Sequence, residues 1–337
     1  MSQVFPTQEQ FILELHTEDQ RRINEFLRRH AFNPFESNAS FEHFLNQSFL
    51  LLNVLPSEVI TALLEFRRNG NDDGVLVIRG LPIDDRRIGL TPQHWSMKYQ
   101  MKQYYETEMY LLGVASILGE VFSFSTQHEG NLVQNVVPLQ ADMYDQVGTG
   151  SKVFLEWHTE DAFHKLAADF IGLLCLRSNI AAATTFASIR MMDIPDKYKH
   201  CLFQRKFQAG IDKAHGGSGR PEDGPVISIL SGRYDDPELR IDTSCVRALP
   251  GETEAQAALD YLIEEMSSVA RQLVLHQGDL LFMDNKRVVH GRTAFTPRFD
   301  GTDRWLQRVS IATDFRKSYP GRIKHFRIIE KNVEFYG

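Results

Sequence analysis

The sequence predicts an α+β protein in which a helical N-terminal region precedes a β-sandwich or jelly roll. Apolar residues recur at helical spacing through about the first 120 residues, whereas beyond them they form short β-branched runs bounded by turns. One amphipathic stretch, 252–273, interrupts these runs and predicts a helical insert. With 337 residues, of which 42% are hydrophobic and 24% charged, the chain can bury a large core.

The N-terminal region contains three predicted helices, over 17–29, 57–68 and 103–119. The first begins with Thr-Glu-Asp-Gln at Thr17, which has the form of a capping box. The second ends before Gly70, because glycine readily adopts the left-handed conformation that closes helices. A turn-rich NGNDDG segment then leads into a short buried strand at 75–78.

The C-terminal part contains many short predicted strands. They cover 132–137, 153–158, 170–177, 184–189, 226–230, 239–242, 273–275, 280–282 and 305–313. Such spacing favours a sandwich or jelly roll. Residues 210–224, GIDKAHGGSGRPEDG, are glycine-rich and polar, so we expect a mobile surface loop there.

Composition excludes several classes of protein. The net charge is −7, which does not provide the basic surface that nucleic acid or an anionic membrane would require. No apolar run approaches the roughly 18 residues of a membrane span, and MSQVFPTQEQ does not resemble a secretory signal, so we expect a cytoplasmic protein. The three cysteines, Cys175, Cys201 and Cys245, are scattered, and we expect buried thiols rather than a zinc or redox site.

The most informative motif is Trp157-His-Thr-Glu-Asp161. Residues two apart on a strand point to the same face, so His158 and Glu160 would direct an imidazole and a carboxylate at one point. His290 stands far downstream in DNKRVVHG. Two histidines and one carboxylate form the facial triad that holds ferrous iron with open positions for O₂ and a cosubstrate. A His-x-Glu pair alone is common by chance, and the chain has 12 histidines.

A pair of arginines strengthens this hypothesis. Arg304 and Arg308 lie four apart on a predicted strand and share a face, whereas Trp305, Val309 and Ile311 occupy the other parity, as core residues do. Two buried guanidiniums need anions, and two organic carboxylates, one from a keto-acid cosubstrate and one from a substrate, would provide them. The alternative is a solvated edge strand with scattered arginines.

Other catalytic patterns are missing from the sequence. It contains neither the phosphate-binding GxxxxGK[ST] motif nor the GxSxG elbow of serine hydrolases. We interpret His164, His200 and His276 as ordinary packing or surface residues.

Two long segments, LEWHTEDAFHKLAADFIGLLCLRSN and LVLHQGDLLFMDNKRVVHGRTAFTPRFDGTDRWLQRVSIATDFRKS, resemble the clavaminate synthase-like iron(II)/2-oxoglutarate oxygenases. The likeness runs from about 75 to 317 and is strongest to members that hydroxylate free L-amino acids in peptide-antibiotic pathways, the arginine 3-hydroxylases above all. It implies a double-stranded β-helix, with 1–337 as one domain, helical over about 1–120 and jelly-roll over about 121–320. It also implies that His158, Glu160 and His290 ligate iron, Glu160 contacting the substrate amine as well.

The resemblance implies further binding residues. Arg304 and Thr184 would hold 2-oxoglutarate, with the adjacent Thr185 as an alternative register. Arg308 would pair with the α-carboxylate of the amino acid, and Gln127 would lie near its amine.

Recognition of the substrate side chain departs from the arginine hydroxylases. Asp212 matches their lid aspartate and Asp242 the first of two strand aspartates, but Ser244 replaces the second. Serine accepts a hydrogen bond but supplies no charge. Asp235 and Asp236 would replace the negative charge missing at Ser244 only if they reached the pocket. Such a pair of aspartates more often lies in a turn.

We therefore expect iron(II)- and 2-oxoglutarate-dependent hydroxylation of a free polar L-amino acid, L-arginine at Cβ first, in natural-product biosynthesis. L-Lysine, L-ornithine, L-asparagine, a cyclic arginine analogue and a carrier-tethered amino acid stay open as substrates, and desaturation stays open as an outcome. Arg308 argues against tethering, because a thioester has no free carboxylate. The 210–224 loop would close over the site. From other classes, a metal-free jelly-roll binding protein and a zinc hydrolase stay open, as does the oligomeric state.

Overall fold

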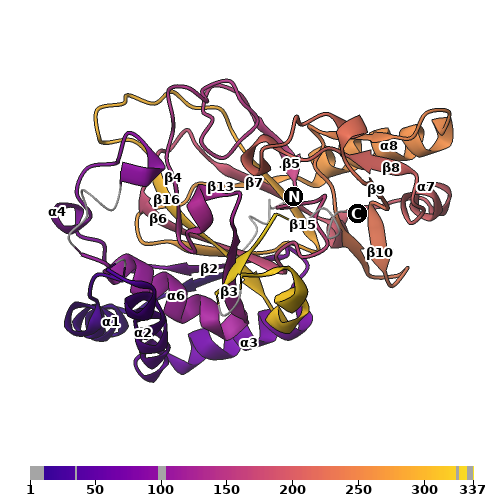
Figure 1. Ribbon diagram of the computed structural model, residues 1–337. Helices are drawn as coiled ribbons and strands as arrows, with labels where there is room; N and C mark the ends of the chain where they lie inside the picture. The colour runs from indigo at the N-terminus through magenta and orange to yellow at the C-terminus, as the bar shows by residue number, and fades with distance from the viewer. Residues whose placement is uncertain (1–10, 35, 98–103, 324–325, 332–336) are drawn as a thin grey trace, which may run out of the picture.

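The computed structural model describes residues 11–34, 36–97, 104–323, 326–331 and 337. Two β-sheets lie face to face, helices cover the outside of the larger sheet, and a mixed lobe extends from one end (Figure 1).

The larger sheet contains the strands β1 (Ile12–Glu14), β2 (Val75–Arg79), β14 (Leu280–Asp284), β6 (Phe170–Arg177), β16 (Trp305–Ala312), β3 (Glu120–Phe124) and β17 (Ile328–Ile329) in this order, with β4 (Gln134–Val136) also paired to β16. The smaller sheet has the order β13 (Arg271–Leu273), β7 (Thr184–Ser188), β15 (Val288–Arg292) and β5 (Leu155–His158). Pairing is antiparallel except for β1 with β2 and β3 with β17. Leu173 and Leu281 of the larger sheet share one apolar core with Phe186 and Val288 of the smaller. This arrangement confirms the predicted jelly roll.

A helical layer covers the outer face of the larger sheet (Figure 1). It consists of α1 (Thr17–His30), α2 (Asn38–Ser48), η1 (Phe49–Asn53), α3 (Ser57–Asn69) and α6 (Glu106–Leu118), with the short turns α4 (Asp85–Ile88) and η2 (Trp95–Met97) beside them. Helix α6 is buried along most of its length, because it lies between the sheet and the other helices. Trp305, Val309 and Ile311 of β16 face this layer, as their parity predicted.

The lobe is inserted between β7 and β13, two neighbouring strands of the smaller sheet. It contains α7 (Asp196–Leu202), α8 (Thr253–Val269), a sheet of β12 (Val246–Ala248), β8 (Phe207–Ala209) and β9 (Val226–Ile227), and a hairpin of β10 (Leu230–Gly232) and β11 (Pro237–Leu239). Short turns complete the chain: η3 (His128–Gly130), η4 (Ile189–Met191), η5 (Lys213–His215), η6 (Pro221–Asp223) and η7 (Phe315–Gly321).

Most predicted elements are present, with some corrected details. Helix α3 ends at Gly70, whose φ is 62°, as expected. The capping box at Thr17 is wrong, because His16 is the N-cap and makes no side-chain cap bond, while the Gln20 side chain donates to the Leu15 carbonyl instead. Of the predicted helix 103–119, residue 103 lies outside the described residues.

Two further boundaries near the lobe differ from the prediction. The helix expected over 252–273 ends at Val269, because Arg271 to Leu273 pair with β7. The strand expected over 239–242 ends at Leu239, and Asp242 makes only an isolated bridge with His158.

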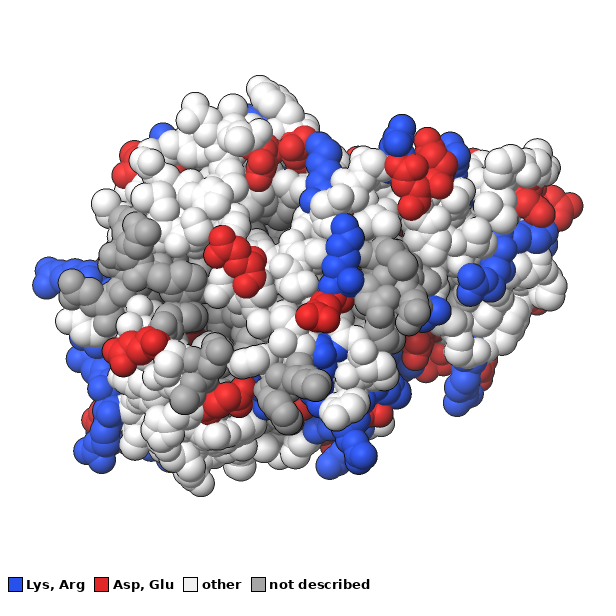
Figure 2. All heavy atoms as spheres, in the orientation of Figure 1, with Lys and Arg blue, Asp and Glu red and all other residues white. Residues whose placement is uncertain are grey.

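The surface and the thiols agree with the composition. Acidic and basic side chains are interspersed on the face shown in Figure 2. All three cysteines are buried and free. Within the described residues, no single helix has the length and apolarity to cross a membrane, although the bent pair Ser40–Asn53 and Ser57–Asn69 passes on those two criteria together.

Candidate active site

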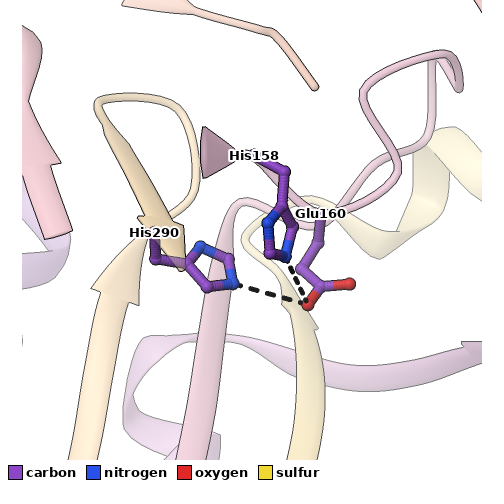
Figure 3. A group of neighbouring side chains, drawn as sticks. All are labelled: His158, Glu160 and His290. Carbon is purple, nitrogen blue, oxygen red and sulfur yellow. Dashed lines mark ion pairs between the residues drawn. The ribbon is translucent and has the colours of Figure 1, made fainter. Parts of the chain in front are cut away.

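His158, Glu160 and His290 converge between the two sheets (Figure 3). The Glu160 Oε1 atom lies 3.8 Å from His158 Nε2 and 3.5 Å from His290 Nε2. The two imidazole rings are 4.3 Å apart between centroids. All three candidate ligand atoms lie within 4.8 Å of one another, so they surround one point.

Strand pairing places the two histidines. His158 at the end of β5 is the register partner of His290 in β15, so the imidazoles are neighbours on one face. Thr159 between them donates from its N–H and its hydroxyl to the Ile241 carbonyl, and Glu160 lies on the side of His158. The Asn285 side chain accepts from the Glu160 N–H at 2.8 Å and donates to its carbonyl at 3.1 Å, which fixes the backbone of the acid.

Glu160 and His158 favour the charged forms of each other. Burial opposes ionisation of Glu160, but Arg308 and the two histidines hold the pKa of that carboxyl well below its usual range. Burial likewise disfavours a charged His158, but Glu160 outweighs it and raises the pKa of His158 to about 9. Burial lowers the pKa of His290 to about 4, so this imidazole is neutral at pH 7.

The donor set fits a ferrous ion. The His158 Nδ1 atom lies 2.8 Å from the Glu156 carbonyl, which orients the ring so that its Nε2 atom faces Glu160. His290 presents its Nε2 atom to the same carboxylate oxygen, so two imidazole nitrogens and one carboxylate oxygen meet on one side of a cavity. Two nitrogens and one oxygen with open positions are the ligands of non-haem iron oxygenases.

The three residues belong to a cavity of about 440 Å³. All of the site residues predicted from the sequence line it, namely Gln127, His158, Glu160, Thr184, Asp212, Asp242, Ser244, His290, Arg304 and Arg308. The structure thus brings together segments from both sheets and from the lobe.

Arg304 lines this cavity and directly precedes β16. Its side chain is buried, with 8% of the residue exposed, and burial lowers the pKa of its guanidinium to about 10. In the ranges that the structure describes, no carboxylate lies within ion-pair distance of Arg304 and no group accepts a hydrogen bond from it. A buried, uncompensated cation is a site for an anion.

The neighbouring strand decides between the two threonines. Thr184 lines the cavity and shares the inner face of β7 with Phe186, whereas Thr185 points to the opposite face. Arg292, the β15 register partner of Thr184, also lines the cavity, and burial lowers its pKa to about 9. Sequence reasoning missed Arg292, because an arginine two residues after a histidine has no distinctive spacing.

Arg308 lies beside the His158–Glu160–His290 group. Its Nη1 donates to Glu160 Oε1 at 2.6 Å, while Gln134 Oε1 accepts from its Nε at 3.1 Å and its Nη2 at 2.6 Å. Gln134 is the β4 register partner of Arg308, so β-pairing sets this orientation. The sequence had not indicated Gln134.

Gln127 belongs to a buried polar cluster. Its Nε2 donates to Asp161 Oδ1 at 2.9 Å, and the same oxygen lies 2.7 Å from His215 Nε2. His215 comes from the middle part of the 210–224 loop, so this predicted surface loop has one side chain held in the interior. The sequence had not indicated Asp161 or His215.

Two aspartates, Asp212 and Asp242, also line the cavity. Burial raises the pKa of Asp212 to about 6. Asp242 Oδ1 accepts from the Ser244 N–H at 2.9 Å and from its hydroxyl at 2.7 Å, so the two residues form a turn rather than the expected strand. Asp235 and Asp236 do not line the cavity, because they pair with arginines elsewhere in the lobe.

Comparison with known proteins agrees with this geometry. The family profile described as "Taurine catabolism dioxygenase TauD, TfdA family" matches residues 54–310. An enduracididine beta-hydroxylase of Streptomyces hygroscopicus is 37% identical over 303 residues, 83% of this chain and 88% of that protein. An L-ornithine/L-arginine 3-hydroxylase of Catenulispora acidiphila is 30% identical over 287 residues, 78% of this chain and 83% of that protein.

Solved structures are similar over nearly the whole chain. A crystal structure of the non-heme iron oxygenase OrfP with Fe, succinate and (3S)-hydroxy-L-Arg has a TM-score of 0.85 and 31% identity, and covers 94% of this chain and 99% of OrfP. A second OrfP structure contains Fe and alpha-ketoglutaric acid. These comparisons favour neither a metal-free binding protein nor a zinc hydrolase.

Proposed function

This chain belongs to the TauD/TfdA dioxygenase family and is an iron- and 2-oxoglutarate-dependent amino-acid hydroxylase, and we propose that it hydroxylates free L-arginine at Cβ. The observation that supports this substrate is the polarity of the cavity. Arg292, Arg304 and Arg308 line the cavity, and Asp212 and Asp242 line it close enough to each other to interact electrostatically. An amino acid with an anionic head and a cationic side chain complements that arrangement.

We assign iron to His158, Glu160 and His290, and 2-oxoglutarate to Arg304 and Thr184. Bound there, iron and 2-oxoglutarate together activate O₂ for oxidation of a C–H bond. Arg304 would receive the distal carboxylate of 2-oxoglutarate in the buried position described above, with the Thr184 hydroxyl beside it.

The amino acid would be held at both ends. Arg308 lies 2.6 Å from Glu160, so an α-carboxylate bound by Arg308 would place the α-carbon next to the iron ligands. Glu160 and Gln127 would face the amine, and Asp212 and Asp242 the side-chain cation. Holding both ends selects one carbon for reaction, because oxidation requires the C–H bond to lie close to the metal.

Residues of the 210–224 loop complete the wall of the cavity. Asp212 and Lys213 line it, and Lys213 forms an ion pair of 2.9 Å with Asp145 of a facing segment. This loop would exclude water while the substrate is bound.

A cyclic arginine analogue such as enduracididine is a second candidate. Ser244 supplies no charge, whereas the arginine hydroxylases resembled here have a second aspartate at that position. A cyclic guanidine presents fewer N–H groups than arginine and needs fewer acceptors. The enduracididine beta-hydroxylase relative supports this alternative.

The test is a panel of free amino acids incubated with the iron-loaded enzyme, 2-oxoglutarate and ¹⁸O₂, with products read by mass spectrometry. The panel contains L-arginine, L-enduracididine, L-lysine, L-ornithine and L-asparagine, and a carrier-tethered arginine. We expect labelled oxygen at Cβ of arginine, and less of this product from Asp212→Asn at the same substrate concentration. Exclusive labelling of enduracididine would favour the second candidate, and labelling of asparagine alone would contradict the assignment of a cationic side chain.

A further inference from the structure

His215 is an unusual residue in the polar 210–224 loop. The flanking Ala214 and Gly216 are exposed, but the His215 side chain is only 2% exposed. Burying an imidazole requires partners for both ring nitrogens, since an unsatisfied polar atom is costly in the interior.

Both ring nitrogens have partners from outside the loop. His215 Nδ1 lies 2.7 Å from the Thr126 hydroxyl, and His215 Nε2 donates to Asp161 Oδ1 at 2.7 Å. The ring packs edge-on between Phe124 and Phe163, with centroid separations of 5.0 Å to each. His215 therefore occupies a socket, defined here as the space between Phe124, Thr126, Asp161 and Phe163.

Asp161 connects the socket to the iron-binding group. It follows Glu160 directly, and its φ of 57° lies in the left-handed region. Asp161 Oδ1 also accepts from Gln127 at 2.9 Å, so His215 and Gln127 share one carboxylate oxygen. Burial would lower the pKa of His215, but Asp161 outweighs burial and raises it.

The same turn positions Asp212. Asp212 is the N-cap of η5, and its Oδ1 accepts from the His215 backbone N–H at 2.9 Å. Because His215 and Asp212 share this one turn, the depth of His215 in its socket determines where the Asp212 carboxylate stands in the cavity.

We propose that His215 is a positioning residue, an anchor that seats the 210–224 loop through Asp161 and Thr126 and so holds Asp212 and Gln127 in place for the amino-acid substrate. The expected change in affinity for the amino acid rests on the proposed function, in which Asp212 binds the substrate. The expected position of the 210–224 loop does not depend on that function. His215 itself need not touch the substrate.

Three substitutions separate the contacts. His215→Phe keeps the ring between Phe124 and Phe163 but removes both hydrogen bonds. His215→Gln can restore a donor at the position of Nε2, whereas His215→Asn reaches only the position of Nδ1. The same histidine-to-phenylalanine change at the exposed His200 of α7 is the matched control.

Two measurements are made on the iron-loaded enzyme. Steady-state kinetics give KM for the amino acid, KM for 2-oxoglutarate, and the ratio of hydroxylated product to succinate. Hydrogen–deuterium exchange of peptides covering 210–224 reports seating of the loop without any substrate. For His215→Phe we expect about a tenfold or larger rise in amino-acid KM, as loss of a charge-assisted hydrogen bond produces. We also expect a lower product-to-succinate ratio, an unchanged KM for 2-oxoglutarate, and exchange in the loop at least tenfold faster.

Comparison of His215→Gln with His215→Asn keeps the proposal testable even if His215→Phe does not fold. His215→Gln should recover most of the wild-type values and His215→Asn should not, so equal behaviour of the two would overturn the proposal even if His215→Phe failed to fold. Unchanged exchange of the loop in His215→Phe would also overturn the proposal, and so would equal rises in both KM values, since equal rises indicate a general loss of structure. Faster loop exchange with unchanged amino-acid KM would retain the anchor and refute the role of Asp212 in binding.

Discussion

Replacing Arg304 by methionine should make the ligand-free protein more stable while weakening its binding of 2-oxoglutarate. Arg304 is 8% exposed and has no ion-pair partner in the described residues. Burial lowers its pKa to about 10 from a usual value near ~12.5, which corresponds to roughly 3 kcal/mol against the charged form. The guanidinium is charged in the folded and unfolded states alike below pH 10, so this penalty is present throughout the neutral range and fades only above about pH 10.

Methionine keeps an apolar stem in the same space and removes the buried charge. We therefore expect ligand-free Arg304→Met to gain about 1–3 kcal/mol in free energy of unfolding, seen as a Tm higher by roughly 1–4 °C. Loss of a charge-assisted carboxylate contact of about 2–3 kcal/mol should raise KM for 2-oxoglutarate on the order of a hundredfold.

Thermal unfolding with and without 2-oxoglutarate measures both effects. At about 100 times Kd the ligand stabilises the wild type by roughly 2.7 kcal/mol, and this shift should disappear in Arg304→Met. Arg298→Met, at an exposed arginine nearby, should change neither quantity. A ligand-free Arg304→Met protein less stable than the wild type, or one with KM for 2-oxoglutarate within threefold of it, would refute the reasoning.

Three other outcomes follow from the site. Glu160→Ala removes a proposed iron ligand and leaves Arg308 without its carboxylate, so we expect loss of bound iron and of hydroxylated product; full turnover would contradict the metal assignment. The pKa of Asp212 is raised to about 6, so amino-acid KM should rise as pH falls below 6, when this carboxylate becomes protonated, and Asp212→Asn should remove that dependence. Ser244→Asp places a second carboxylate beside Asp242 and should raise kcat/KM for arginine about tenfold relative to enduracididine; an unchanged ratio would show that Ser244 does not face the side chain.

Local sequence patterns were sufficient to predict features that depend on one continuous segment, such as the face that a side chain occupies or the residue at which a helix ends. The alternation in β16 predicted which side chains face the helices and which face the cavity, and the His-x-Glu spacing predicted that His158 and Glu160 share a side. Gly70 predicted the end of α3 because its backbone conformation is a local property. Each of these follows from the periodicity of one segment.

Interactions between distant segments were the part that local patterns missed. Strand β15, which positions His290, was not predicted because its inner face has a histidine and an arginine in place of apolar residues. The turn at Asp242 replaced an expected strand, since only the partner strands determine where pairing stops. No spacing indicated Asn285, Gln134 or His215, whose partners lie far along the chain.

The sequence by itself determined the reaction class, through a metal-binding motif and two arginines in a long, specific resemblance. Only the tertiary structure decided that Thr184 rather than Thr185 faces the cavity, that Asp235 and Asp236 do not line it, and that His215 of the 210–224 loop is buried. The physical reason is that a segment's periodicity records which side chains share a face, whereas strand register and the packing of remote segments determine which faces meet.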